Sequence, residues 1–224
     1  RSSSLFPVGV AAVREGAVTA AVDRFEIIFN GKGTHAAHPQ KGVDPIVAAS
    51  AFVTAVQSVI SRNADPFAAD LISITHFQGG NTWNVIPEKA CLEGTTRTLK
   101  AKDRSMVRQR IYDLSDHIAK AFGATAQIRW YDGPPATDND KKWTKFAEKI
   151  AQQNGLTVEP SPNSLGGEDF AFYQEKIKGA FIQIGTGLSY PNHNPHFQID
   201  PSALFPAANY MAQLAVHALE QIKK

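Results

Sequence analysis

The sequence has 224 residues, 43% of them hydrophobic, and its 23 basic and 21 acidic residues give a formal net charge of +2. This apolar content excludes a disordered chain, and so small a charge argues against a nucleic-acid partner bound through bulk electrostatics. Cys91 is the single cysteine, which excludes an internal disulfide and any zinc motif built on pairs of cysteines.

The sequence offers no segment typical of secretion or membrane insertion. Its first residues, RSSSLFP, contain no apolar signal core. The longest apolar stretch, Val43–Ile60, includes Asp44, Pro45 and four hydroxyl or amide side chains. Such a stretch suits a helix packed on a protein core better than a membrane span. We therefore expect a cytoplasmic protein without a membrane partner.

The first region begins with a strand and a helix. Residues 24–30 predict a strand, because their apolar side chains alternate onto one face. Asp44 is expected to cap a helix that has Pro45 at its first position. The apolar face of this helix is expected to consist of Ile46, Ala49, Val53, Val56 and Ile60.

Two more strands follow, at 71–77 and 89–99, rich in residues that favour β structure. In the first of them Ile72 and Ile74 share one face, and His76 is a candidate third member. The glycines at 79–80 predict the turn between the two strands.

A second helix and a last strand complete the first region. Asp103 is expected to cap the helix, Gly123 to end it, and residues 125–131 to form the strand. The resulting order, β-α-β-β-α-β, predicts a ferredoxin-like unit in which two helices cover one face of a four-stranded antiparallel sheet.

The second region follows the boundary sequence that starts at Gly133. It predicts helices at about 138–154 and 204–222 and a strand at 180–185. One clear strand does not make a sheet, so we expect this region to need more protein to close its core, even together with the first twenty residues. The predicted division is 1–22 and 133–224 for this region and 23–132 for the ferredoxin-like domain.

Candidate functional residues of the second region lie in loops. His193, in the loop YPNHNPHF after the predicted strand, could bind zinc through a neutral imidazole. Spacing alone favours the alternative, a polar loop whose histidines bond to backbone. Glu168 and Asp169, after two glycines, could orient a ligand histidine or could be the acidic start of a helix, and these readings weigh equally.

The first region contributes three more candidates. His35, in a glycine-flanked loop, could donate a hydrogen bond to a developing oxyanion, although a surface histidine is the more frequent case. Asn84 and Arg97 are expected to flank the turn between two strands. The amide could donate to a carbonyl and the guanidinium could bind a carboxylate, although a cross-strand ion pair is the commoner role of such an arginine.

Four motifs occur together along the chain: FEIIFNGKGTHAAHPQKGVDP at 25–45, NVIP at 84–87 with GTTR at 94–97, GEDF at 167–170 and HNPHF at 193–197. In this order they resemble the metal-dependent amidohydrolases that include hippurate hydrolase, aminoacylase and the auxin-conjugate hydrolases. The resemblance extends from about Phe6 to the C-terminus.

The resemblance implies an α/β enzyme of two domains. A zinc-peptidase-like α/β catalytic domain, incomplete in this chain, would bind two divalent metal ions, zinc or manganese. The ferredoxin-like unit at 23–132 would be a lid inserted into it and would form a homodimer. The implied reaction is hydrolysis of the amide bond of an N-acyl amino acid.

The resemblance also implies roles for single residues. His193 would be a metal ligand, and His35 would reach the partner subunit's site and polarise the scissile carbonyl. Asn84 would help to hold the substrate, and Arg97 would bind its free carboxylate. The pair at 168–169 would give second-shell support to the metal site.

The chain departs from the family pattern in one respect. The family's His-x-Cys-Gly-His-Asp motif, its glutamate base and its other metal ligands have no counterpart in these 224 residues. His193 is then the one remaining ligand. We therefore expect the chain alone to bind no metal stably and to be inactive, and we expect a metal-binding half upstream in the gene.

Two rival functions remain. A non-catalytic dimerisation module would have no use for His35, Asn84, Arg97 and His193, so their presence favours the enzyme. A ferredoxin-like RNA-binding domain would carry stacking aromatic residues on its sheet, and these are missing from the strands at 71–77 and 89–99.

Overall fold

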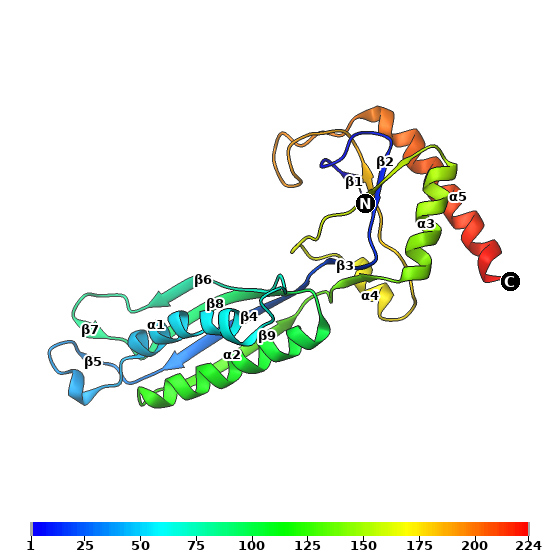
Figure 1. The fold of residues 1–224 in the computed structure, drawn as a ribbon. Helices are drawn as coiled ribbons and strands as arrows, with labels where there is room; N and C mark the ends of the chain where they lie inside the picture. Colours follow the sequence, from blue (N-terminus) through cyan, green and yellow to red (C-terminus); the bar gives the residue numbers. More distant parts are fainter. Residues whose placement is uncertain (1, 224) are drawn as a thin grey trace. The chain divides into compact units, whose positions relative to one another are not determined.

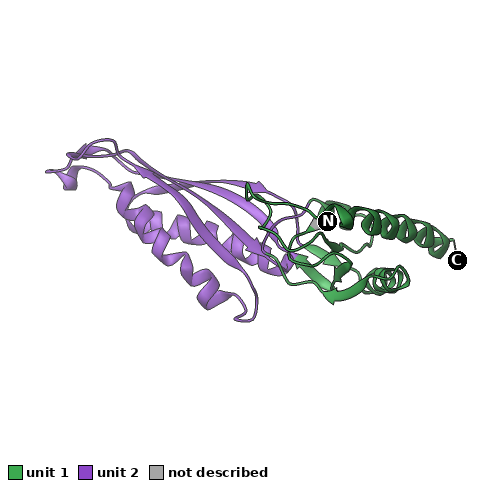
Figure 2. Ribbon diagram, turned by 90° about the horizontal axis from the view of Figure 1, so that it is seen from above, with its two compact units in different colours: residues 1–18, 137–164, 169–224 green, residues 19–136, 165–168 purple. Residues whose placement is uncertain are grey.

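The computed structural model describes residues 2–223, which divide into two compact units (Figure 2). Unit 1 comprises the described part of residues 1–18, 137–164 and 169–224. Unit 2 comprises residues 19–136 and 165–168. The predicted domains at 1–22, 23–132 and 133–224 stay a prediction, because compact units need not coincide with the domains of a whole protein.

Unit 2 contains one four-stranded sheet in the order β6-β8-β4-β9, and each neighbouring pair is antiparallel. Its strands are β4 (Ala21–Asn30), β6 (Leu71–Gly79), β8 (Lys89–Thr98) and β9 (Thr125–Asp132). The central strand β4 pairs along its length with β8 on one side and β9 on the other (Figure 1). The predicted strands are therefore present, each with ends within three residues of the predicted ones.

Two helices, α1 (Pro45–Ala55) and α2 (Ala101–Ala121), pack on one face of this sheet. Phe25, Ile27 and Phe29 of β4 are fully buried beneath them, as their alternation predicts. The order β4-α1-β6-β8-α2-β9 is the β-α-β-β-α-β order expected from the sequence. The core of unit 2 is thus closed by residues of unit 2 itself.

The first helix begins as predicted, and the second does not. Asp44 accepts hydrogen bonds from the backbone N–H groups of Ile46 and Val47, so it caps α1. The cap of α2 is Lys100, which makes no side-chain cap bond, and Asp103 lies inside the first turn. The prediction for Asp103 was wrong because β8 leads almost directly into the helix. A carboxylate in the first turn still interacts favourably with the helix dipole.

The buried face of α1 differs from the predicted stripe. The residues buried on the helix and on the π-helical segment η2 (Val59–Asn63) that follows are Pro45, Ala48, Ala49, Phe52, Val56 and Val59. Ile46, Val53 and Ile60 pack at the margin of the core. The segment Pro45–Asn63 is long and apolar enough to cross a membrane by composition. Its contacts with the sheet show the packed core helix expected from the sequence.

The strand β6 contains an irregularity that moves His76. The pairing with β8 shifts between Ile74 and His76, which places the imidazole on the exposed side. There its Nδ1 lies 3.3 Å from Oε1 of Glu93. His76 is therefore not a member of the inner face, because a bulge reverses the alternation that a sequence pattern assumes.

Unit 1 has a sheet of its own, contrary to the prediction. The order is β1-β12-β2-β11, with parallel pairs at both edges and an antiparallel pair in the middle. The strands are β1 (Ser2–Ser3), β2 (Val10–Val13), β11 (Thr157–Pro160) and β12 (Gln183–Gly185). A further pair joins β3 (Gly16–Thr19) to β10 (Thr137–Asn139). Strands of two to four residues are too short to show a period, which is why the sequence did not reveal them.

The helices of unit 1 are α3 (Lys141–Gln153), α4 (Phe170–Gln174) and α5 (Leu204–Ile222), with a short 3-10 turn, η3 (Pro201–Ala203), before the last. Both long helices lie where the sequence predicts them. Tyr210 is the residue that α5 buries, and its hydroxyl donates to the carbonyl of Ala147 on α3 at 3.0 Å. Apolar side chains of α5 that remain exposed are Leu204, Phe205, Met211, Val216, Leu219 and Ile222.

Candidate functional site

His35 lies beside Asn84 at one end of unit 2. The two-residue strands β5 (Thr34–His35) and β7 (Val85–Ile86) pair there, with His35 opposite Val85. The N–H of Ala36 donates to the carbonyl of Asn84 at 3.0 Å. Figure 1 shows β5 and β7 beyond the same end of the four-stranded sheet. His35 thus belongs to a short ladder rather than to the loop that the sequence suggested.

The hydrogen bonding of His35 fixes which ring nitrogen can donate. Its Nδ1 accepts the backbone N–H of Ala37 at 3.1 Å. A neutral imidazole that accepts at Nδ1 carries its proton on Nε2, an assignment that follows from this bond. The side chain is exposed, so the Nε2–H group is available to a ligand. Nε2–H is therefore the group that could donate, and the role of His35 stays a prediction.

A neighbouring side chain occupies the acceptor atom of Asn84, as the Ala37 N–H does for His35. The hydroxyl of Thr82 donates to Oδ1 of Asn84 at 3.2 Å. With its oxygen occupied as an acceptor, the amide keeps its NH2 group for donation. The sequence analysis missed Thr82, because no sequence pattern encodes this bond between two side chains. Two N–H donors, one imidazole and one amide, are thus prepared at this end of unit 2.

Arg97 lies at the opposite end of the sheet. It stands eight positions after Lys89 on β8, which corresponds to about 27 Å along an antiparallel strand. The expectation that Asn84 and Arg97 flank one turn was therefore wrong, because β8 continues unbroken from the turn to Arg97. Its cross-strand neighbours are Val22 and Leu71, both apolar, so no acid lies directly opposite for the ion pair considered as an alternative.

The segment 165–168 lies at the Arg97 end. The N–H of Ala20 donates to the carbonyl of Gly166 at 3.1 Å. A side chain at Gly167 would come within 2.8 Å of Cγ2 of Val22, the strand partner of Arg97. The glycine therefore permits this close approach. Glu168 belongs to this segment, whereas Asp169 starts α4 in unit 1 without a side-chain cap bond. The second-shell role of the two acids stays a prediction.

His193 occupies a strained position in the loop between β12 and η3. Its φ of +71° falls in the left-handed region, which a residue with a side chain adopts at a cost of about 1–3 kcal/mol. Turns hold it on its C-terminal side, where the N–H of His196 donates to Oδ1 of Asn194 at 2.9 Å. The His193 side chain is exposed. Such strain in a held loop is common at functional sites.

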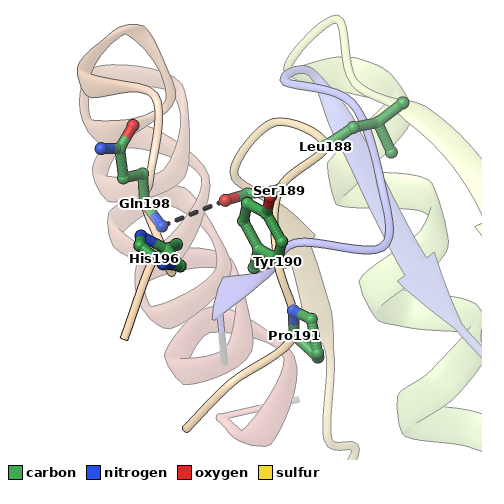
Figure 3. A pocket seen from close by; sticks show the side chains of 6 residues that line it. All are labelled: Leu188, Ser189, Tyr190, Pro191, His196 and Gln198. Carbon is green, nitrogen blue, oxygen red and sulfur yellow. Dashed lines mark hydrogen bonds between the residues drawn. The ribbon is translucent and has the colours of Figure 1, made fainter. Parts of the chain in front are cut away.

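An open hollow of about 640 Å³ adjoins this loop (Figure 3). The residues that line it are Leu188, Ser189, Tyr190, Pro191, His196 and Gln198. The rings of Tyr190 and His196 lie 5.5 Å apart, and the N–H of Gln198 donates to the Ser189 hydroxyl at 3.1 Å. The loop that carries the predicted metal ligand therefore also shapes a hollow large enough for a small molecule.

The donor set does not by itself fit the metal centre that the resemblance implies. Within residues 2–223, no three histidine, cysteine, aspartate or glutamate side chains converge. A protein zinc site uses three or four ligands, and His193 supplies one. The described residues therefore provide at most one of the ligands that such a centre needs.

The sequence profile of peptidase family M20/M25/M40 matches residues 6–217. The chain belongs to this family. The predicted relationship to metal-dependent amidohydrolases is thereby confirmed, whereas membership of the hippurate hydrolase subgroup stays a prediction.

Named relatives of the family support this assignment. The chain is 42% identical over 217 residues to N-acetylcysteine deacetylase of Bacillus subtilis, covering 97% of this chain and 57% of that protein. It is 34% identical over 220 residues to thermostable carboxypeptidase 1 of Saccharolobus solfataricus, covering 96% and 56%. The chain thus spans little more than half the length of these relatives.

A solved family member shares the fold. The crystal structure of a dinuclear metal binding peptidase of the M20 family from Bacillus subtilis superposes with a TM-score of 0.84 at 36% identity. The match covers 98% of this chain and 56% of that one. The mixed α/β class predicted from the sequence is therefore confirmed.

Proposed function

We propose that this chain is part of a hydrolase that cleaves the amide bond of N-acyl amino acids. Family membership and the similarity to a deacetylase support the reaction class. The observation that carries the proposal is the pair of N–H donors at one end of unit 2, where Ala37 and Thr82 leave His35 and Asn84 ready to donate. Hydrogen-bond donors held in place are what stabilises the oxygen of a scissile carbonyl.

His35 and Asn84 act on that carbonyl oxygen. The Nε2–H of His35 and the amide NH2 of Asn84 donate to it, and both bonds strengthen as negative charge develops there. A neutral imidazole keeps the Nδ1 lone pair that accepts the Ala37 N–H, and in this form its Nε2–H is the donor. His35 therefore stabilises charge without transferring a proton.

Arg97 recognises the other end of the substrate. A guanidinium binds a carboxylate through two parallel hydrogen bonds, which fixes both position and orientation. This contact would select amides whose amino-acid portion carries a free carboxylate. Half-buried between apolar strand neighbours, Arg97 has the partly dehydrated setting in which such a bond is strong.

The separation of these residues supports a homodimer. His35, on β5, lies beyond the Lys89 end of the four-stranded sheet, and Arg97 stands about 27 Å from Lys89 along β8, a span far longer than an N-acyl amino acid. One copy of unit 2 cannot place both on one substrate. We propose that unit 2 is a ferredoxin-like lid inserted into the catalytic domain. It dimerises, so that His35 and Asn84 serve the partner's site and Arg97 serves the site of its own subunit.

Divalent metal ions, zinc or manganese, belong to this proposal for the complete protein. His193 would be one ligand, and Glu168 and Asp169 would support the metal site from the second shell. Because the described residues supply no complete donor set around His193, we expect the 224-residue chain alone to hold no zinc or manganese stably there and to show no amidase activity. Chelator-sensitive hydrolysis by the purified chain would contradict this expectation. A cytoplasmic location completes the proposal.

The test is hydrolysis of N-acetyl amino acids by an intact protein that contains this chain. His35→Ala is expected to lower kcat about 10²–10³-fold, the usual loss of one oxyanion donor. Arg97→Ala is expected to raise KM for substrates with a free carboxylate. For the same substrates with that carboxylate converted to an amide, KM is expected to change little.

The matched control is His38→Ala. The ring of His38 lies 5.8 Å from that of His35 and is equally exposed, yet no step uses it. We expect His38→Ala to retain activity. An intact protein without hydrolase activity that still dimerises through unit 2 would support the non-catalytic alternative instead.

A further inference from the structure

Three oxygen atoms near the start of α2 are buried without a hydrogen-bond partner in the described part of the chain. They are Oδ2 of Asp70, Oγ1 of Thr98 and Oδ2 of Asp103. Asp70 exposes 7% of its surface and Thr98 exposes 1%. Buried polar atoms in folded proteins nearly always have a partner, so this group requires an explanation.

The sheet register brings Asp70 and Thr98 together. Leu71 of β6 pairs with Arg97 of β8, so the residue before Leu71 stands opposite the residue after Arg97. Directly opposed residues on antiparallel strands point to one face with their Cβ atoms about 5 Å apart. The N–H of Leu99 also donates to Oδ1 of Asp70 at 3.4 Å. The free Oδ2 therefore lies beside the buried threonine.

Asp103 adds a second carboxylate from the first turn of α2. Leu99, whose N–H bonds Asp70, lies two residues before α2 begins, so the first turn that carries Asp103 adjoins Asp70. Burial raises the pKa of Asp70, and the next largest cause is the charge of Asp103. Lys100 opposes this rise and Asp65 adds to it. The positive end of the α2 dipole lies here too and favours negative groups at this position. Two acidic side chains and a hydroxyl oxygen are thus gathered at the start of α2.

We propose that Asp70, Thr98 and Asp103 bind a hard divalent cation, with calcium as the best fit. Carboxylate and hydroxyl oxygens are ligands that such cations prefer, and no nitrogen or sulfur donor takes part. Calcium accepts irregular oxygen sets, whereas magnesium demands a nearly octahedral one.

A water molecule or a proton at the three buried oxygens would be a simpler explanation, but each accounts for only part of the arrangement. A water molecule would satisfy the three oxygens but would leave both carboxylate charges side by side. A proton shared by the carboxylates would remove one charge but would leave the Thr98 oxygen without a partner. A divalent cation would both coordinate the three oxygens and neutralise the two carboxylate charges. The site uses none of the residues given a role in the proposed reaction. Arg97 precedes Thr98 on β8, but successive side chains of a strand point to opposite faces of the sheet.

The test is the thermal stability of the chelator-treated 224-residue chain with and without calcium chloride, together with titration calorimetry. Saturating calcium is expected to raise Tm by about 5 °C, with one ion bound per chain. Asp70→Asn is expected to abolish the rise and, without calcium, to be at least as stable as the wild type, since it removes the charge repulsion. Thr98→Val is expected to weaken binding about tenfold and Thr98→Ser to restore it.

Two variants locate the effect. Asp116→Asn removes an exposed carboxylate on the same helix, one that pairs with Lys120, and is expected to keep the full calcium response. His193→Ala is expected to keep it too, which separates this site from the proposed metal centre. Equal responses of the wild type and Asp70→Asn would place the ion elsewhere and overturn the proposal. It is also overturned if calcium has no effect, because water or a proton then occupies the position.

Discussion

Unit 2 and unit 1 differ in how completely their helices are covered. In unit 2 the 21-residue helix α2 buries Val107, Ile111 and Ala119 in a core that the unit closes itself. In unit 1 the 19-residue helix α5 buries Tyr210 alone and leaves six large apolar side chains exposed. The comparison teaches that unit 2 should be stable on its own residues, whereas unit 1 depends on a few anchors.

The largest expected effect is that unit 2 folds without unit 1. Residues 19–136 expressed alone are expected to unfold in one cooperative transition with a free energy of unfolding of about 5–15 kcal/mol, because their core is complete. Denaturant unfolding followed by circular dichroism measures this. A broad transition without a folded baseline would remove the proposed difference between the units.

The next effect concerns the buried ion pair at the α2 end of unit 2. Arg104 donates to both oxygens of Asp23, at 2.6 and 2.9 Å, and Asp23 is 1% exposed. Arg104→Ala is expected to lower the free energy of unfolding by about 3–5 kcal/mol, because it leaves a buried carboxylate uncompensated. Its control is Arg108→Ala, which breaks an exposed pair with Asp132 and should cost less than about 1 kcal/mol. Equal losses in the two variants would mean that Asp23 is not the buried anchor.

In unit 1 the hydroxyl of Tyr210 is expected to contribute measurably to stability. Tyr210→Phe removes the bond to the Ala147 carbonyl and is expected to cost about 1 kcal/mol. Burial raises the pKa of Tyr210, so the hydroxyl stays protonated and donates throughout the accessible pH range. Tyr173→Phe, at a 66% exposed residue, should have no effect in the same chemical denaturation. Matching stabilities for the two variants would show that α5 is not anchored through Tyr210.

The smallest expected effect is a pH dependence that arises at Asp70. Burial and the neighbouring Asp103 raise its pKa in the folded state, Lys100 opposes this, and Asp65 adds to it. Below the unfolded pKa of about 3.9 the group is protonated in both states and costs nothing. As the pH rises through the folded pKa, the folded state must ionise it and loses stability. In calcium-free buffer the stability of wild type relative to Asp70→Asn should therefore fall between acid and neutral pH. A difference that is flat with pH would contradict the assignment.

Sequence patterns predicted the elements of unit 2 well because each is long. Strands of eight to ten residues and a helix with a capping aspartate carry their period and boundary signals within themselves. In unit 1 the same reasoning found α3 and α5 and missed the sheet. Its strands pair segments up to 182 positions apart, such as Ser2 with Ile184, and are too short to show alternation.

The candidate site was predictable in its residue types and not in its arrangement. Motifs pointed to His35, Asn84, Arg97 and His193, but spacing along the chain suggested that Asn84 and Arg97 share a turn. Only the length of β8 shows that they lie at opposite ends. The tautomer of His35 and the orientation by Thr82 depend on single hydrogen bonds that no pattern encodes.

The most direct test of the account mixes two impaired variants of the intact protein, assayed at a substrate concentration low enough that both have lost most of their activity. A His35→Ala subunit keeps Arg97, and an Arg97→Ala subunit keeps His35. If the two ends of unit 2 serve different subunits, a mixed dimer contains one complete site. Random mixing after dissociation is then predicted to restore about a quarter of the wild-type hydrolysis of an N-acetyl amino acid. No recovery, although mass spectrometry shows that mixed dimers have formed, would contradict the account.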